Sequence, residues 1–120
     1  MTEKVCIKVK NLRKLGYANL REWMEDENNL YVGRHGRIFI EGKIFHYTGS
    51  KWGNPFKSKD FESIDECLMK YEDHVYESGL IDDIYELEGK KLGCFCETES
   101  CHASVLCRIL EEMNFVPEKK

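Results

Sequence analysis

Apolar and polar residues alternate at the start of the chain in the two-residue period of a β-strand. Val5, Ile7 and Val9 alternate with more polar neighbours, so a strand through residues 5–10 has one apolar face. Short apolar runs predict two further strands at residues 30–32 and 91–96, the second of them buried. Apolar residues on both sides of Glu41-Gly42-Lys43 predict a β-hairpin.

Helical periodicity and capping residues predict the remaining elements. Asn19 with Glu22, and Ser63 with Glu66, have the spacing of a capping box. The first box predicts a short helix over residues 20–26, and the second an amphipathic helix that stops at Gly79. A short helix is predicted over residues 82–88, closed by Gly89. A last helix carries an apolar stripe from Val105 to Met113 and ends at Pro117.

Strands that alternate with helices predict the α/β class, as one compact domain over residues 1–120 with a mixed sheet, packed helices and a β-hairpin. No apolar run reaches the ~18 residues that cross a bilayer, and no signal or lipidation pattern is present, so we expect no membrane association. We therefore expect a cytoplasmic protein, in the host cytoplasm if the source is viral. Its six cysteines are then buried residues, metal ligands or reactive thiols rather than a disulfide framework.

Charge is distributed unevenly along the chain. The net charge of −4 argues against non-specific nucleic-acid binding. Residues 33–59 carry six basic side chains and one acidic one, whereas residues 60–100 carry thirteen Asp and Glu against three Lys. A basic segment beside an acidic one suits a small anionic ligand, although an ordinary solvated surface would show the same pattern.

The segment from residue 94 to residue 102 holds the richest chemistry. Side chains alternate along a strand, so Cys94 and Cys96 share a face. Ser100, Cys101 and His102 fall at the start of the last helix, where backbone N–H groups and the helix dipole favour anions and thiolates. Cys101 as a nucleophile and His102 as an acid/base are therefore candidate catalytic residues.

Two other interpretations of this segment stay open. Cys94, Cys96, Cys101 and His102 have the residue types of a zinc site, but neighbouring ligands on a helix diverge and the spacing is unlike that of a zinc knuckle. Alternatively the cysteines are small buried hydrophobes, as we expect for Cys6, Cys67 and Cys107. No metal or other cofactor is expected on the first and third interpretations.

The loop Lys51-Trp52-Gly53-Asn54-Pro55-Phe56 places two aromatic residues around a turn-forming core. One interpretation makes it a ligand-lining loop, in which Trp52 stacks on a ligand and Asn54 reads its polar groups. The other makes it a structural loop that is held to the core by its aromatic side chains.

These motifs together resemble the family called domain of unknown function 4326. The matching pieces lie within about residues 4–112: Asn11-Leu12-Arg13-Lys14, Leu30-Tyr31-Val32-Gly33-Arg34, Ser50 to Phe56, Gly89 to Cys96, and Cys101-His102. The family usually has Gly after Cys-His, where this chain has Ala103. The final segment is also similar to domain of unknown function 488. The resemblance implies a shared pocket but no established reaction.

The sequence thus predicts a cleft that binds a nucleotide-like or other anionic small molecule. Arg34, Trp52, Asn54 and Ser100 are its expected ligand-binding residues, with hydrolase or transferase chemistry at Cys101 and His102. The alternative is a non-catalytic zinc-binding or protein-interaction module. Walker, G-x-S-x-G and H-E-x-x-H motifs are absent from the sequence, which removes the commonest enzyme classes.

Overall fold

A three-stranded parallel sheet forms the centre of the computed structural model, which describes residues 2–95 and 101–114. Its strands are β1 (Glu3–Cys6), β5 (Lys91–Cys94) and β2 (Asn29–Tyr31), in the spatial order β1-β5-β2. The middle strand aligns Gly93 with Val5 on one side and with Tyr31 on the other. Because all three strands are parallel, their carboxyl ends meet at one edge of the sheet.

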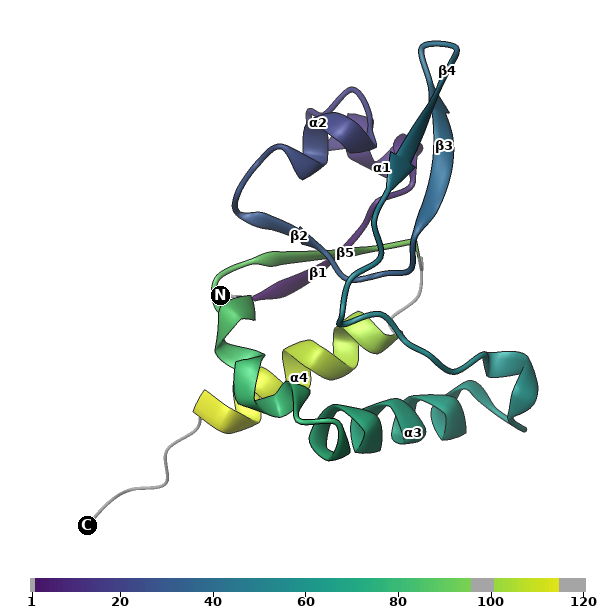
Figure 1. Cartoon of the computed structure of the whole chain (residues 1–120). Helices are drawn as coiled ribbons and strands as arrows, with labels where there is room; N and C mark the ends of the chain where they lie inside the picture. The colour runs from purple at the N-terminus through teal and green to yellow at the C-terminus, as the bar shows by residue number, and fades with distance from the viewer. Residues whose placement is uncertain (1, 96–100, 115–120) are drawn as a thin grey trace.

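Helices cover both faces of this sheet (Figure 1). The short helices α1 (Val9–Lys14) and α2 (Leu20–Met24) lie on one face, where Trp23 and Leu12 are fully buried. On the other face lie α3 (Ile64–Glu77), the 3₁₀ helix η2 (Leu80–Leu87) and α4 (His102–Asn114). A further 3₁₀ turn, η1 (Ser58–Asp60), leads toward α3. The larger apolar core lies on this second face.

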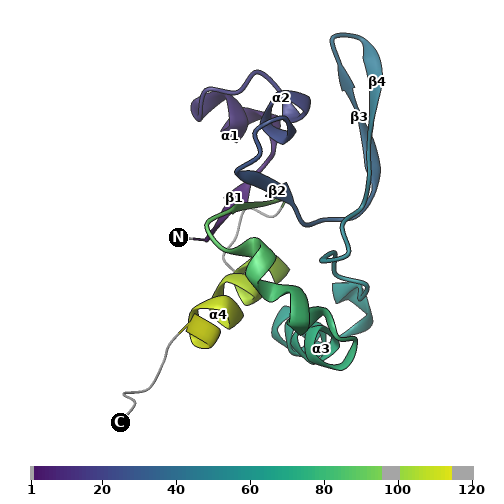
Figure 2. The ribbon, with the colours of Figure 1, turned by 60° about the vertical axis from the view of Figure 1, so that its left-hand side comes forward.

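The hairpin forms a second, separate sheet. Its strands β3 (Gly36–Ile40) and β4 (Lys43–Tyr47) pair antiparallel and stand beside α1 and α2 (Figures 1 and 2). Glu41 and Gly42 both have positive φ, 54° and 80°, as a two-residue hairpin turn requires. The predicted α/β class and hairpin are confirmed, with parallel and antiparallel strands in two different sheets.

Both predicted capping residues cap their helices. The Asn19 side chain accepts a hydrogen bond from the backbone N–H of Glu22 at 2.9 Å, and Ser63 accepts from Glu66 N–H at 3.1 Å. Gly79 follows α3 with φ of 90°, which allows the chain to leave the helix. No helix in the described part of the chain is long and apolar enough to span a membrane.

Two predicted elements differ in extent or type. The first strand ends at Cys6, and Val9 begins a helix although it continues the apolar alternation. Asn11 explains the change, because its side-chain amide donates to Cys6 O at 2.7 Å and turns the chain at this point. The short helix predicted over residues 82–88 is present as the 3₁₀ helix η2, which spans Leu80–Leu87. The expected helix end at Pro117 lies outside the described residues.

Gly93 allows the sheet to contact α2 closely. A Cβ atom at this position would lie 2.7 Å from Ile7 Cγ2 and against the ring of Trp23, both of which are buried. Gly93→Ala should therefore lower the free energy of unfolding by about 1–3 kcal/mol, because a packed core resists an added methyl group. Urea denaturation measures the change.

Met69→Ala is a suitable control, because Met69 is 67 % exposed on α3. Its free energy of unfolding should change by less than about 0.5 kcal/mol. Equal stability of Gly93→Ala and the unmodified chain would contradict the close packing described here.

Candidate functional site

A hollow of about 550 Å³ opens at the carboxyl edge of the parallel sheet. Residues from the end of β2, the end of β5, the loop before α3 and the start of α4 line it. In α/β folds this edge is where ligands usually bind, because loops with free polar groups leave the strands there.

The hollow gathers most of the predicted site residues. Arg34, Asn54, Cys101 and His102 all line it, although up to 68 positions separate them in the chain. Trp52 does not line it. Ser100, the remaining predicted ligand-binding residue, lies outside the described residues, as does Cys96.

Arg34 holds the 50–56 loop in place. Its Nε donates to Asn54 O at 3.0 Å, and its Nη2 donates to Phe56 O at 2.8 Å. One edge of the guanidinium is thus used inside the protein, while the exposed side chain still presents N–H groups of the other edge. Arg34 was expected to bind a ligand, but the bidentate partners of its guanidinium in this structure are two backbone carbonyls.

Trp52 anchors the same loop to η2 and α3. Its side chain is 1 % exposed, and its Nε1–H donates to Glu86 on η2 at 2.7 Å. Its carbonyl accepts the hydroxyl of Tyr71 on α3. A ring buried in this way cannot stack on a ligand, so the expected aromatic wall at Trp52 is replaced by the structural interpretation of the loop.

Asn54 shapes the rim of the hollow. Its Oδ1 accepts the backbone N–H of Phe56 at 2.9 Å, and its Nδ2 points at Cys67 Sγ, 3.8 Å away. The first bond forms an Asx turn that reverses the chain before Phe56. Among the described residues the amide donates only to Cys67, so its second N–H could serve a ligand, whereas Oδ1 is already used as an acceptor.

Cys101 sits at the floor of the hollow, directly before α4. It is 2 % exposed, and its Sγ accepts the backbone N–H of Ala103 at 3.3 Å. The sulfur therefore occupies the position of a helix N-cap acceptor. At this position the backbone N–H groups and dipole of the helix start favour the thiolate form of Cys101.

Cys94 lies against this sulfur. The two Sγ atoms are 3.2 Å apart, and Cys94 is also 2 % exposed. The hydrogen bond from Cys94 lowers the pKa of Cys101 below its ordinary value of 9.0; burial opposes this, while backbone N–H groups at Ser104 and Ala103 and the charge of His102 assist. The lowered pKa favours the thiolate form of Cys101, although its sulfur is more buried than reactive thiols usually are.

His102 is fixed by the sheet and by α3. Its Nε2 lies 2.6 Å from Val32 O, and its ring meets the ring of Tyr71 edge-on with centroids 5.3 Å apart. A carbonyl only accepts, so Nε2 carries the proton and Nδ1 is the nitrogen that can exchange one. An acid/base role would therefore depend on Nδ1.

Three of the four candidate zinc ligands lie within the described residues. Cys94, Cys101 and His102 all line the hollow, but Nε2 of His102 is used by Val32 O. Among residues 2–95 and 101–114, no group of three or more His, Cys, Asp or Glu side chains is arranged to hold a metal ion. The fourth residue, Cys96, falls outside this range.

An aromatic wall of the hollow was not recognised in the sequence. Tyr31, Tyr47 and Phe95 come from three different strand ends and meet with ring centroids 5.3–6.3 Å apart. Burial and the neighbouring Tyr47 raise the pKa of Tyr31, whose hydroxyl donates to Arg34 O. An aromatic residue at or directly after the end of each of three strands was the available signal, but the meeting of the three rings depends on the placement of the hairpin.

The rim of the hollow is basic. Arg34, Lys57 and Lys59 line it together with His35, and no Asp or Glu is among its lining residues within the described part of the chain. All four are exposed. Like-signed charges around a concave surface add, so a rim of this composition would favour an anionic ligand over a cationic one.

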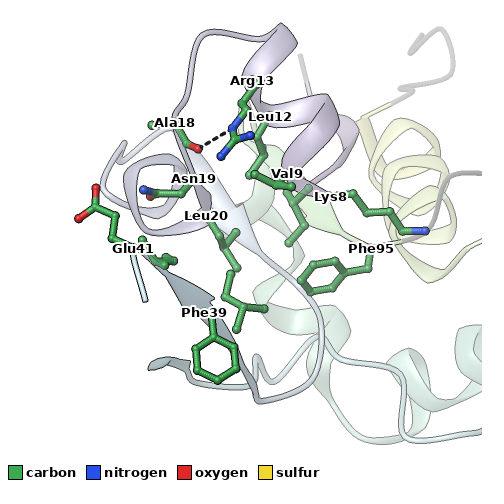
Figure 3. A pocket seen from close by; sticks show the side chains of 13 residues that line it. Lys8, Val9, Leu12, Arg13, Ala18, Asn19, Leu20, Phe39, Glu41 and Phe95 are labelled. Atoms are coloured by element: carbon green, nitrogen blue, oxygen red, sulfur yellow. Dashed lines mark hydrogen bonds between the residues drawn. The ribbon is translucent and has the colours of Figure 1, made fainter. Parts of the chain in front are cut away.

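A second hollow, of about 520 Å³, lies on the other side of Phe95 between α1, α2 and the hairpin (Figure 3). Its walls are mostly aliphatic and aromatic, with Leu12, Leu20 and Phe39 among them, and Arg13 at its edge donates to Ala18 O. Two basic residues and one acidic residue line it, namely Lys8, Arg13 and Glu41, and neither Cys94 nor Cys101 is among its described lining residues. We take the first hollow as the candidate site because its described lining combines the thiol pair with basic but no acidic side chains.

The pH dependence of thiol alkylation should distinguish Cys101 from Cys107. The rate at Cys101 should rise with pH and level off well below pH 9, because its pKa is lowered. The rate at Cys107 should still rise there, because burial raises its pKa to about 11. Iodoacetamide labelling at a series of pH values, read by peptide mass spectrometry, measures both.

The alkylation rate of each cysteine is divided by its own rate at the highest pH. The shapes of the two pH profiles can then be compared even though iodoacetamide reaches the two thiols to different extents. Cys101→Ser provides the control for assignment, since serine preserves the N-cap. A Cys101 profile that still climbs through pH 9 would contradict the activated thiolate.

Comparison with known proteins places the chain in a family. A family model described as "Domain of unknown function (DUF4326)" matches residues 17–112, so the expected match from about residue 4 starts later and the 11–14 motif lies outside it. An uncharacterized protein of Acanthamoeba polyphaga mimivirus is 33% identical over 102 residues, covering 76% of this chain and 75% of that protein. No solved structure matches. The chain belongs to the domain of unknown function 4326 family.

Proposed function

We propose that the hollow at the carboxyl edge of the sheet binds an anionic small molecule with a planar group, such as a nucleotide. The observation that carries this proposal is the meeting of a basic rim and an aromatic wall in one concave site. Phosphate recognition needs cationic donors, and a planar base needs an aromatic face.

The two parts of such a ligand have separate partners. Lys57, Lys59 and the free edge of Arg34 would contact the phosphate groups. Tyr31, Tyr47 and Phe95, which are half-buried, would contact the planar group. Asn54 would donate its remaining N–H.

Removing the rim charges should weaken binding. We expect the double variant Lys57→Gln/Lys59→Gln to raise the Kd for ADP by about tenfold, because two exposed ion pairs of up to ~1 kcal/mol each are lost. Calorimetric titration at low salt measures the Kd, and higher salt should weaken binding to the unmodified chain as well.

Lys43→Gln is the matched control, since Lys43 is an exposed lysine at the tip of the hairpin and does not line the hollow. Adenosine tests the anionic part, because it keeps the planar group and lacks phosphate. The proposal is wrong if no nucleotide binds, or if adenosine and ADP bind equally well.

Nucleophilic catalysis at Cys101 is a second candidate, favoured by the lowered pKa of its thiol at the floor of the same hollow. The thiolate would attack an electrophilic centre of the bound ligand, displace the leaving group, and form a covalent cysteinyl intermediate that water hydrolyses. Nδ1 of His102 is the group that would transfer the proton.

Cys101→Ser separates this candidate from simple binding. With p-nitrophenyl phosphate as a probe, we expect nitrophenolate release by the unmodified chain and at least a 100-fold slower release by the variant. Nucleotide binding should persist in Cys101→Ser. Absence of release by the unmodified chain would exclude phosphate-ester transfer at this thiol and leave the binding proposal standing.

A further inference from the structure

The contact between Cys94 and Cys101 joins two elements that meet only in the folded protein. Cys94 is the last residue of β5, and Cys101 is the residue before α4, seven positions later. The Sγ atoms are 3.2 Å apart, so about 1.2 Å of approach separates them from the ~2.0 Å length of an S–S bond. The nucleophilic role proposed for Cys101 makes no use of Cys94 as a reacting group.

Both sulfur atoms are within reach of a very small oxidant. Cys94 and Cys101 line the floor of the hollow, although each residue is only 2 % exposed. A peroxide little larger than water can enter where a bulky reagent is hindered. Burial also protects an oxidised sulfur from thiols of other molecules, so the neighbouring sulfur is its nearest partner.

We propose that Cys94 and Cys101 are a site of reversible oxidation, at which a peroxide converts the two thiols into an intramolecular disulfide. The proposal does not depend on the ligand of the hollow. It requires only the facing sulfur atoms and access for the oxidant.

The chemistry has two steps. In the first, the Cys101 thiolate attacks one oxygen of hydrogen peroxide; an S–O bond forms, the O–O bond breaks, and hydroxide leaves, so sulfur loses two electrons and the peroxide gains them. In the second, the sulfur of Cys94 attacks the Cys101 sulfenic acid. The S–S bond forms, the S–O bond breaks, and the hydroxide leaves as water with the proton from Cys94. A dithiol reductant returns two electrons and restores both thiols.

The geometry favours this pair over Cys67 and Cys107. Cys67 also lines the hollow, but the contact recorded for its Sγ is with Asn54 Nδ2 at 3.8 Å. The pKa of Cys107 is raised by burial, which keeps that thiol protonated and slow to react. Ala103 N–H and the start of α4 hold Cys101 as the thiolate that begins the reaction.

Oxidation should also change the hollow. The disulfide removes the thiolate from its floor and withdraws the negative charge that faces the basic rim. It links the end of β5 directly to the start of α4, and so restrains the connection between them.

Peptide mapping tests the proposal on the unmodified chain. The protein is treated with hydrogen peroxide, its remaining thiols are blocked, and it is cut with trypsin and a glutamyl endopeptidase. Cleavage after Lys91, Glu97, Glu99 and Arg108 separates residues 92–97 from residues 100–108. We expect these two peptides to be linked, with fragmentation locating the bond between Cys94 and Cys101. Dithiothreitol should release them.

A bond through Cys96, Cys67 or Cys107, a bond between two chains, or no bond at all would overturn the proposal. The digest shows which cysteines are bonded, and non-reducing gel electrophoresis of the intact protein shows a bond between two chains as a species of twice the mass.

Variants test the order of the steps. In Cys94→Ser, Cys101 keeps its place at the helix start but loses its partner, so it should proceed to sulfenic and sulfinic acid. We expect roughly tenfold more oxygenated 100–108 peptide than in the unmodified chain. Cys107→Ser is the matched control and should form the disulfide normally. Equal oxygenation with and without Cys94 would contradict its role as the resolving thiol.

Discussion

The pairing of β5 with both β1 and β2 is the interaction on which the rest of the structure depends. β5 begins at residue 91, far along the chain from both of its partners. It lies between β1 and β2, which do not pair with each other. Such pairing is entropically costly because the partners are distant in the chain. Buried residues on both faces offset that cost, with Leu92 against α4 and Gly93 against Trp23.

The same strand creates the candidate site. β5 delivers Cys94 to the carboxyl edge of the sheet, next to the end of β2 that carries Arg34. The chain then returns at Cys101 to begin α4. A parallel sheet whose middle strand leads into a helix thus brings a thiol pair, an arginine and the start of a helix dipole to one place.

Several residues that suggest ligand binding in the sequence support the site instead of lining it. Trp52 is buried between η2 and α3, and Arg34 uses one edge of its guanidinium on the loop that Trp52 anchors. This supporting shell holds the basic rim in position around the hollow. The two roles are compatible, because a rigid loop reduces the entropy that ligand binding must overcome.

Two uses of the Cys101 sulfur follow from the same contacts. A lowered pKa serves nucleophilic attack on a bound ligand and attack on a peroxide equally well. The position of Cys94 favours the second use, since a resolving thiol is in contact. The basic rim favours the first, since it would hold an anionic electrophile over the floor. Oxidation of Cys101 to the disulfide would remove the nucleophile, so the redox state of the thiol pair would control the reaction with the bound ligand.

Local patterns determined much of this protein. The caps at Asn19 and Ser63, the hairpin turn at Glu41-Gly42 and the placement of Cys101 at the start of α4 follow from short-range hydrogen bonding and periodicity, which a sequence displays directly. The meeting of Arg34 with Cys101 and His102 was also foreseen, from a family resemblance rather than from geometry.

Tertiary structure alone decided which side chains face each other. Trp52 is buried because Glu86 and Tyr71 supply partners from remote helices. The wall of Tyr31, Tyr47 and Phe95 and the contact of Cys94 with Cys101 depend on strand order and on the path of the connections. These are long-range properties, and residue periodicity carries no record of them because it reports only the environment of each position along its own element.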